Sequence, residues 1–465
     1  MSAPLIWILI PLGMVPLLWI PRRERVTASL GGGLTLLLAV TAWELPLETV
    51  LRLGPWAIKI ASTLEILGRR LILTNTDRPL LALIYGMAAF WFMASAAAGN
   101  SRRLVPLGLA IVALLVASLA VEPFLYAALL IEIAALLVIP LLSFPEQPPG
   151  RGLIRFLIYQ TLAMPFILFS GWLLAGIEAS PGDLALVIQT AILLGLGFAF
   201  LLAIFPLHTW IPLLAEEAPI YSVGFILMML PTATLLFALG FLERYTWLRT
   251  STDLLLILRY AGILMLAVAG FLSAFQRHLG RIFGYAVILE TGFSLLALSL
   301  GGRIGLELLF LPLIPHAVGM GVWALALSIL QRETPSLRFR DVKGLARPWS
   351  FAATSIILAG LSLVGIPLLA GFPIRQALWE QLARQSLSTA FWVLFGSLGL
   401  LTGTIRSLAV LVMAPEGSRW ESRETWPQRL FLGFGWLMLF ILGLFPQWGT
   451  PILEALPKVF EHLGR

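Results

Sequence analysis

The stretch that decides the fold is residues 205–212, Phe-Pro-Leu-His-Thr-Trp-Ile-Pro, which interrupts an apolar run that begins near residue 184. Proline lacks a backbone N–H and fixes its own φ, so a helix that reaches these residues ends or kinks. A second interruption, Gly-Ile-Pro-Leu-Leu-Ala-Gly-Phe-Pro, covers residues 365–373 of a later apolar run. Helices broken inside an apolar run are typical of membrane proteins in which the freed backbone groups line a buried site. The residues that break the helices are Pro206, Pro212, Pro367, Gly371 and Pro373.

The composition around these breaks places the whole chain in a membrane. Of the 465 residues, 59% are hydrophobic and 12% are charged, and the mean hydropathy is +0.94. Water-soluble domains contain roughly 45–50% apolar and 25% charged residues. The net charge of +7 comes from basic residues in short loops between apolar runs, where they indicate membrane topology. No nucleic-acid partner is expected.

The apolar runs predict an all-α integral membrane protein with about 14 transmembrane helices in one membrane domain, residues 1–465, since one span needs about 20 residues. With an even number of spans, both termini lie on one side of the membrane. More lysine and arginine residues lie on the side of the loop after the first span, so the termini are predicted to be non-cytoplasmic. Residues 45–78 are too charged to span and are predicted to form a hairpin on the membrane surface. The predicted spans lie near residues 4–20, 27–44, 79–98, 104–121, 123–143, 153–177, 184–204, 219–242, 253–274, 281–300, 304–330, 350–371, 385–413 and 428–449.

The two breaks also indicate an internal duplication. Pro206 and Pro367 are 161 residues apart, and the two carboxylates nearest the middle of a span, Glu132 and Glu290, are 158 residues apart. Similar offsets are expected if spans 4–8 and spans 9–13 are copies of one five-helix unit. An odd number of spans in each unit inverts the second copy relative to the first. The predicted repeats are residues 104–242 and residues 253–413.

Few ionisable groups fall inside the spans, and each is a candidate functional group because a charge at mid-membrane is costly. Glu132 and Glu290 are predicted to face the bundle interior, either protonated or paired; a glutamic acid bonded to nearby backbone is the alternative. Arg375 follows the second break and is placed to pair with Glu290. His208 and His316 could relay protons, because imidazole titrates near neutral pH, or could hydrogen-bond a helix break.

Several classes of chemistry are disfavoured in this chain. Cysteine is absent, and no two of the four histidines have metal-ligand spacing on one helix, so no cofactor and no metal site are expected. There is no nucleotide-binding glycine fingerprint. Residues 31–33, Gly-Gly-Gly, lie inside a span and predict close packing against a neighbouring helix.

Together these motifs resemble the antiporter-like membrane subunits of complex I, the NADH:quinone oxidoreductase, and their Mrp antiporter and membrane-bound hydrogenase relatives. The most specific part is Pro-Leu-His-x-Trp-x-Pro at residues 206–212, followed by Glu-Ala-Pro at 217–219. Further matches are the Glu132 helix, Arg-Ile-Phe-Gly-Tyr at 281–285 and Gly-Leu-Ser-Leu-Val-Gly-Ile-Pro at 360–367. The resemblance implies inverted repeats of helices 4–8 and 9–13, broken helices 7 and 12, and a proton path along the membrane centre.

The chain departs from this family in its cations. The family carries lysines on helices 7 and 8, where Leu201 and Pro231 stand here, and Glu290 occupies a position that is a histidine in many members. The helix 5 glutamate remains as Glu132, and helix 12 keeps a cation as Arg375. Burial lets a lysine release its proton, whereas arginine keeps its proton. Two interpretations follow: a modified proton route through glutamate, histidine and water, or a mainly structural or gating member.

The resemblance implies an antiporter-like membrane subunit of a complex I-type oxidoreductase, which contributes to or structurally supports proton translocation coupled to quinone reduction. The expected partners are other membrane subunits and the lipid bilayer, and the expected location is a bacterial inner membrane or another energy-transducing membrane. The alternative is a stand-alone or Mrp-type cation/proton antiporter subunit, which would need a fuller set of intramembrane acids and bases.

Overall fold

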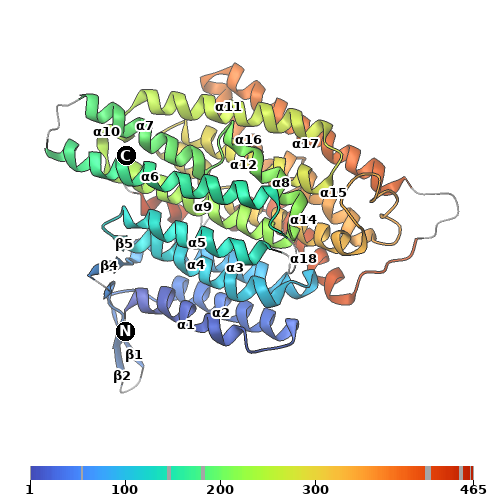
Figure 1. Cartoon of the computed structure of the whole chain (residues 1–465), viewed down its shortest axis with the longest axis horizontal. Helices are drawn as coiled ribbons and strands as arrows, with labels where there is room; N and C mark the ends of the chain where they lie inside the picture. Colours follow the sequence, from blue (N-terminus) through green and yellow to red (C-terminus); the bar gives the residue numbers. More distant parts are fainter. Residues whose placement is uncertain are drawn as a thin grey trace.

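The computed structural model describes residues 2–53, 56–66, 68–143, 148–179, 184–413, 420–449, 454–460 and 462–463. The helices run side by side along one bundle, and the strands lie at one end of it (Figure 1). Ser2, the first described residue, pairs with Ala61, and the 3-10 turn η5 (Leu456–Val459) contacts η2 (Asn75–Asp77). The first and last described segments therefore meet at the same end of the bundle, as an even number of spans requires.

The apolar helices follow the predicted spans closely. Within the described residues, eleven are long and apolar enough to cross a membrane, and three shorter apolar helices complete the set of predicted spans. The long spans are α2 (Glu24–Glu44), α3 (Arg78–Ala98), α4 (Ser101–Ala120), α6 (Arg151–Ala179), α7 (Leu184–Leu201), α9 (Ile220–Arg244), α11 (Thr252–Phe275), α12 (Leu279–Leu298), α13 with α14 (Gly302–Phe310 and Leu313–Glu333), α17 (Leu387–Val412) and α18 (Trp426–Leu444). The shorter ones are η1 with α1 (Leu5–Leu9 and Ile10–Leu18), α5 (Tyr126–Leu142) and α15 (Ser350–Val364). Three further helices are α8 (Trp210–Glu217), α10 (Thr246–Arg249) and α16 (Gly371–Gln385), and two 3-10 turns are η3 (Leu207–Thr209) and η4 (Pro446–Gly449).

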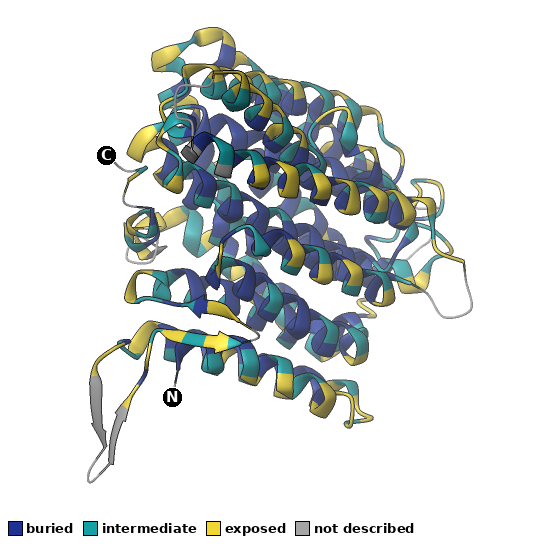
Figure 2. Ribbon diagram, turned by 60° about the vertical axis from the view of Figure 1, so that its left-hand side comes forward, coloured by how far each residue is buried: buried dark blue, intermediate teal, exposed yellow. Residues whose placement is uncertain are grey.

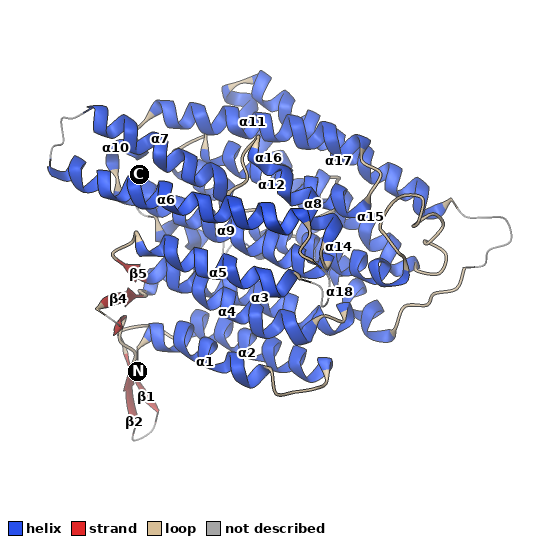
Figure 3. Ribbon diagram, viewed as in Figure 1, coloured by secondary structure: helices blue, strands red, loops and turns tan. Residues whose placement is uncertain are grey.

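The predicted hairpin between the second and third spans is confirmed, and the segment forms two small sheets (Figure 3). One is an antiparallel pair, β1 (Val50–Leu53) with β2 (Trp56–Lys59). The other is antiparallel in the order β3 (Thr63–Ile66), β4 (Arg69–Ile72) and β5 (Val121–Glu122). Apart from these sheets and two isolated bridges, the regular secondary structure of the described residues is helical. This segment lies outside the apolar runs, and its backbone N–H and C=O groups find hydrogen-bond partners by pairing across a turn. Short strands form here for that reason.

The distribution of buried residues is that of an integral membrane protein. Buried residues fill the inside of the bundle, and exposed residues follow the outer faces of the peripheral helices (Figure 2). In α12, 83% of the most apolar 18-residue window is buried, against 22% in α7. Large apolar side chains such as Leu387 on α17 and Trp172 on α6 are more than 70% exposed. A bilayer solvates such side chains, which a water-soluble surface would leave unfavourably exposed.

Glycines let the helices approach one another closely. A Cβ atom on Gly32 of α2 would lie 2.5 Å from the Met93 side chain of α3, and one on Gly31 would overlap Val105 of α4, so the predicted packing of residues 31–33 is confirmed for these two. On α12, a Cβ atom on Gly284 would lie 2.8 Å from the Pro212 Cα of α8. These close approaches fix the short helix α8 against the centre of the bundle.

We expect Gly284→Leu to destabilise the fold, because the new side chain would collide with the α8 backbone. Overpacking of this kind costs about 1–3 kcal/mol. The measurement is the thermal unfolding midpoint of the purified chain in detergent. Gly195→Leu on α7 is the matched control, since a Cβ atom at Gly195 meets nothing within 4 Å. Equal midpoints for the two variants would contradict the close α8–α12 contact.

Candidate functional site

The first predicted break lies between α7 and α8. The chain turns at Ala203, which has a positive φ of 53°, and the Phe205–Pro206 peptide is cis. Because the helix stops here, the Leu201 carbonyl has no donor from a following helical turn. It accepts a hydrogen bond from Gln160 Nε2 of α6, at 3.3 Å. The break predicted from the prolines is confirmed, and a side chain from another helix caps it.

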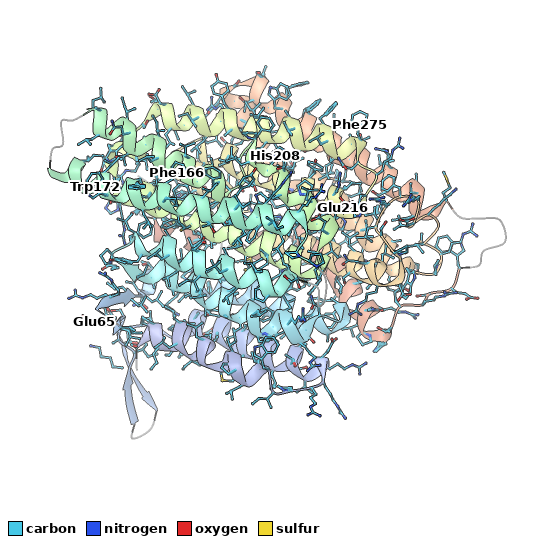
Figure 4. All side chains as sticks on the ribbon, in the orientation of Figure 1. Glu65, Phe166, Trp172, His208, Glu216 and Phe275 are labelled. Atoms are coloured by element: carbon cyan, nitrogen blue, oxygen red, sulfur yellow. The ribbon has the colours of Figure 1, made fainter. Side chains whose placement is uncertain are left out.

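His208 lies in the 3-10 turn of this break and is 5% exposed. Its ring stacks on Phe205, with the ring centroids 5.5 Å apart. Within the described residues its Nδ1 atom has no hydrogen-bond partner. Figure 4 shows His208 well inside the length of the bundle, between its two ends. A buried ring nitrogen in this setting can bond to a water molecule or exchange a proton.

Glu132 lies near the edge of the bundle and not at its centre, with one carboxylate oxygen buried, and its part in a proton path stays a prediction. It is only partly buried on α5, and its Oε1 atom accepts a hydrogen bond of 2.7 Å from Thr161, which is exposed on α6. The Oε2 atom is buried and has no partner within the described residues. The reason is the position of α5 and α6, whose outer faces expose apolar residues such as Ile133 and Leu162. Glu132 therefore lies at the seam between α5 and α6, close to their exposed faces.

The second predicted break lies between α15 and α16. Gly365 ends α15 with a φ of +91°, a conformation that glycine adopts without a Cβ penalty. A Cβ atom on Gly371 would lie 1.8 Å from the Ser362 carbonyl oxygen, so only glycine fits at that position. The Leu363 carbonyl accepts hydrogen bonds from Arg375 Nε at 3.1 Å and Nη2 at 3.0 Å. This break is also confirmed, and Arg375 caps it.

The predicted pair between Glu290 and Arg375 is confirmed. Arg375 Nη2 donates to Glu290 Oε1, and the side chains of Arg375 and Glu290 are 9% and 6% exposed. The guanidinium also lies over the Phe293 ring, 3.5 Å from its centroid. A buried carboxylate, a carbonyl and an aromatic face thus surround one cation. Such a pair is costly to break, because either partner alone is an uncompensated buried charge.

His316 of α14 joins this pair at a small cavity. Glu290, His316, Ser362 and Arg375 all line the cavity, which has about 10 Å³ for the centre of a water molecule, enough for about one. The His316 Nε2 atom has no partner within the described residues. The structure therefore brings three of the predicted residues together at the second break. His208 lies at the first break, and Glu132 bonds to Thr161, the residue after the Gln160 that caps this break.

Charged side chains gather where α8 ends against the start of α12. Arg281 Nε donates to Glu216, which is labelled in Figure 4, and Arg338 Nη2 lies 3.8 Å from the same carboxylate. His278 caps α12 by accepting a hydrogen bond from the Arg281 backbone N–H through Nδ1, at 3.4 Å. Burial lowers the pKa of His278 to about 4, partly offset by the charge of Glu216. This cluster fixes the far end of the broken helix.

Comparison with known proteins agrees with this geometry. The family model described as NADH:quinone oxidoreductase/Mrp antiporter, TM, matches residues 174–402. The NADH-quinone oxidoreductase subunit N of Dehalococcoides mccartyi is 24% identical over 365 residues, which cover 71% of this chain and 74% of that protein.

Two solved structures share the fold. A chain of the membrane-bound sulfane sulfur reductase, an archaeal respiratory membrane complex, matches with a TM-score of 0.79 and 17% identity over 99% of this chain and 97% of that one. A chain of respiratory complex I from Thermus thermophilus matches with a TM-score of 0.72 and 19% identity over 99% of both. The resemblance seen in the sequence motifs is therefore confirmed. The family match includes both breaks, Glu290 and Arg375, whereas Glu132 lies before it.

Sequence reasoning missed Gln160, Thr161 and Ser362. A single polar side chain in an apolar helix has many ways to be satisfied, and the sequence does not say which helix supplies its partner. Within the described residues, no group of three or more His, Asp or Glu side chains that could hold a metal gathers. The expectation that the chain carries no cofactor stays a prediction.

Glu290→Gln is expected to destabilise the chain by about 3–5 kcal/mol, because it leaves the buried Arg375 guanidinium without its counter-charge. The double variant Glu290→Gln/Arg375→Met should unfold at a higher temperature than the single variant, because it leaves no unpaired charge. Thermal unfolding in detergent is the measurement. Glu380→Gln, which breaks an exposed pair with Arg384, is the control and should change stability by less than about 1 kcal/mol. Similar losses in Glu290→Gln and Glu380→Gln would contradict a buried pair.

His278 should make stability depend on pH. Its pKa of about 4 in the folded chain lies below the usual 6.5, so the unfolded chain binds more protons between these values. Stability is therefore expected to fall as the pH decreases from about 6.5 to 4, by up to about 1.4 kcal/mol for each pH unit. His278→Asn keeps an N-cap acceptor and should reduce this slope. Unfolding midpoints of the wild type and of His278→Asn, measured at several pH values, test this prediction. If stability depends on pH equally in both, the effect belongs to the groups that face His278, which are Glu216, Arg281, Arg338 and Asp341.

Proposed function

We propose that this chain, an antiporter-like membrane protein with the NADH:quinone oxidoreductase/Mrp antiporter transmembrane domain, is a membrane subunit of a complex I-type oxidoreductase. In that assembly it contributes to proton translocation coupled to quinone reduction. The observation that carries the proposal is the pair of broken helices, each capped by a side chain from another helical segment and each beside a histidine with a buried, unpartnered ring nitrogen in the described residues. Broken helices with polar groups at mid-bundle are a common way to build an ion path in a membrane.

The residues of the two breaks have different chemistry. His208 at the first break and Glu132 on α5 can each take up and release a proton. At the second break, His316 faces the cavity beside the Glu290–Arg375 pair. Arginine holds its proton, so Arg375 supplies a fixed positive charge and does not relay protons. Proton movement through this chain therefore depends on the glutamates, the histidines and water.

The proposed partners are other membrane subunits. The outer faces of α5, α6 and α7 expose apolar residues around Glu132, which a lipid bilayer or another subunit would cover. Electron transfer would take place in other chains of the assembly. Relatives named as NADH-quinone oxidoreductase subunits favour this assembly over a stand-alone cation/proton antiporter. We further propose that the chain resides in a bacterial inner membrane or another energy-transducing membrane, with non-cytoplasmic termini.

Glu132→Gln is expected to lower the number of protons translocated per electron pair by the purified assembly in vesicles. The amide keeps the size of the side chain and cannot release a proton. Electron transfer and the subunit composition are measured on the same samples, so that a loss of assembly is recognised. Glu307→Gln, which removes an exposed carboxylate paired with Arg303, is the control. An unchanged ratio in Glu132→Gln would overturn proton transfer through Glu132.

The proposed assembly has its own test. An affinity-tagged full chain, expressed in its native host and solubilised in mild detergent, should purify together with other membrane subunits and with subunits that oxidise an electron donor. Purification of the chain alone, at a native size of one subunit, would contradict the proposal.

A further inference from the structure

At each broken helix, a side chain from another helical segment caps one backbone carbonyl, and the two carbonyls lie within one residue of corresponding positions. At the first break it is the Leu201 carbonyl, and at the second it is the Leu363 carbonyl. These residues are 162 residues apart, close to the 161 that separate Pro206 from Pro367. An uncapped carbonyl in a bilayer is costly, so the capping side chain holds the break in place.

The first cap is weak and neutral. Gln160 is 2% exposed and donates one amide N–H to the Leu201 carbonyl at 3.3 Å, near the upper limit for a hydrogen bond. The helix that carries Gln160, α6, packs against α7 before the break and against α8 after it. On α6, Phe156 contacts the Trp210 ring at 5.1 Å between centroids, and a Cβ atom on Gly197 of α7 would lie 2.6 Å from Ile167. Gln160 is therefore held in place while its single bond remains easy to break.

The second cap is strong and charged. Arg375 makes two hydrogen bonds to the Leu363 carbonyl, one ion pair with Glu290 and one contact with the Phe293 ring. A Cβ atom on Gly365 would lie 2.5 Å from Arg375 Cγ, so the turn closes tightly around this side chain. Separating Arg375 from its partners would leave a bare cation in the membrane interior.

The first cap is also next to Glu132. Thr161, which donates to the Glu132 carboxylate at 2.7 Å, is the residue after Gln160 on α6. Glu132 is therefore linked by one hydrogen bond to the residue that follows Gln160 on α6. At the second break, the Glu290 carboxylate binds the capping side chain of Arg375 directly. No intermediate residue such as Thr161 lies between the acid and the cap.

We propose that Gln160 is a positioning residue, a releasable cap through which Glu132 controls the first broken helix, while Arg375 is a fixed cap at the second. The first break then opens and closes, and the second stays closed. The releasable cap is independent of the assembly in which the chain works, whereas its consequence for proton transfer rests on the proposed function.

Hydrogen–deuterium exchange of the purified full chain in detergent tests the caps. We expect amides in residues 201–208 to exchange faster than those in residues 364–371. Gln160→Leu removes the donor and should speed exchange in 201–208 by about five-fold, the effect of losing one hydrogen bond, with 364–371 unchanged. Gln428→Leu is the matched control, because Gln428 is a buried glutamine that donates to the Ala97 carbonyl at the end of α3, also at 3.3 Å. It should alter neither segment.

Gln160→Glu separates hydrogen bonding from packing. The acid has the size of the amide and can donate to the Leu201 carbonyl only while it is protonated. Exchange in 201–208, relative to the wild type at each pH, should therefore rise as the pH rises. A ratio of one at every pH, or equal exchange at the two breaks of the wild type, would overturn the proposal. This variant also remains informative if Gln160→Leu fails to fold.

Proton translocation by the assembly is measured separately on Gln160→Leu. Faster exchange with an unchanged number of protons per electron pair would support the releasable cap and count against proton transfer at the first break. Unchanged exchange would overturn the cap whatever the translocation result, so failure of the cap and failure of the proposed function give different outcomes.

Discussion

A broken helix in a bilayer leaves backbone carbonyls without a helical donor, and in surroundings poor in water these carbonyls need donors from elsewhere in the fold. The arrangement of this chain around its centre follows from that constraint. Gln160 and Arg375 supply the donors, and the glycines at the second break give Arg375 the room to do so. The ionisable groups near the breaks are therefore also part of what keeps the fold intact, which couples stability to the chemistry of the site.

The two halves of the chain meet the same constraint with different charges. The second break holds a buried ion pair, so its charge is fixed and its geometry is tight. The first break holds a neutral amide, with His208 and Glu132 nearby but with no basic side chain bonded to Glu132 in the described residues. Leu201 and Pro231, which stand where the resemblance implies lysines on helices 7 and 8, both lie in the first half. The chain keeps the scaffold of an antiporter-like subunit, whereas the charges within that scaffold differ from those that the resemblance implies.

The close packing of α8 explains how a helix of eight residues stays fixed beside the first break. Its backbone lies against Gly280 and Gly284 of α12, and Glu216 at its end binds Arg281. Both contacts join the first half of the chain to the second. Close backbone contacts and one ion pair therefore connect the first break to α12, the helix that carries Glu290.

The sequence by itself determined the spans, the two breaks, the surface hairpin and the pairing of Glu290 with Arg375. The length of an apolar run and the effect of a proline are local properties of the sequence. An unpaired buried charge is costly, and the sequence offers Arg375 as the partner for Glu290. Only the tertiary structure decided that Glu132 lies at the bundle edge, that Gln160 caps the Leu201 carbonyl and that His316 joins the ion pair at one cavity. These features depend on which helix faces lie against each other. In a chain with apolar residues on nearly every face, hydrophobic pattern does not specify those contacts; close packing of small residues and single polar side chains does.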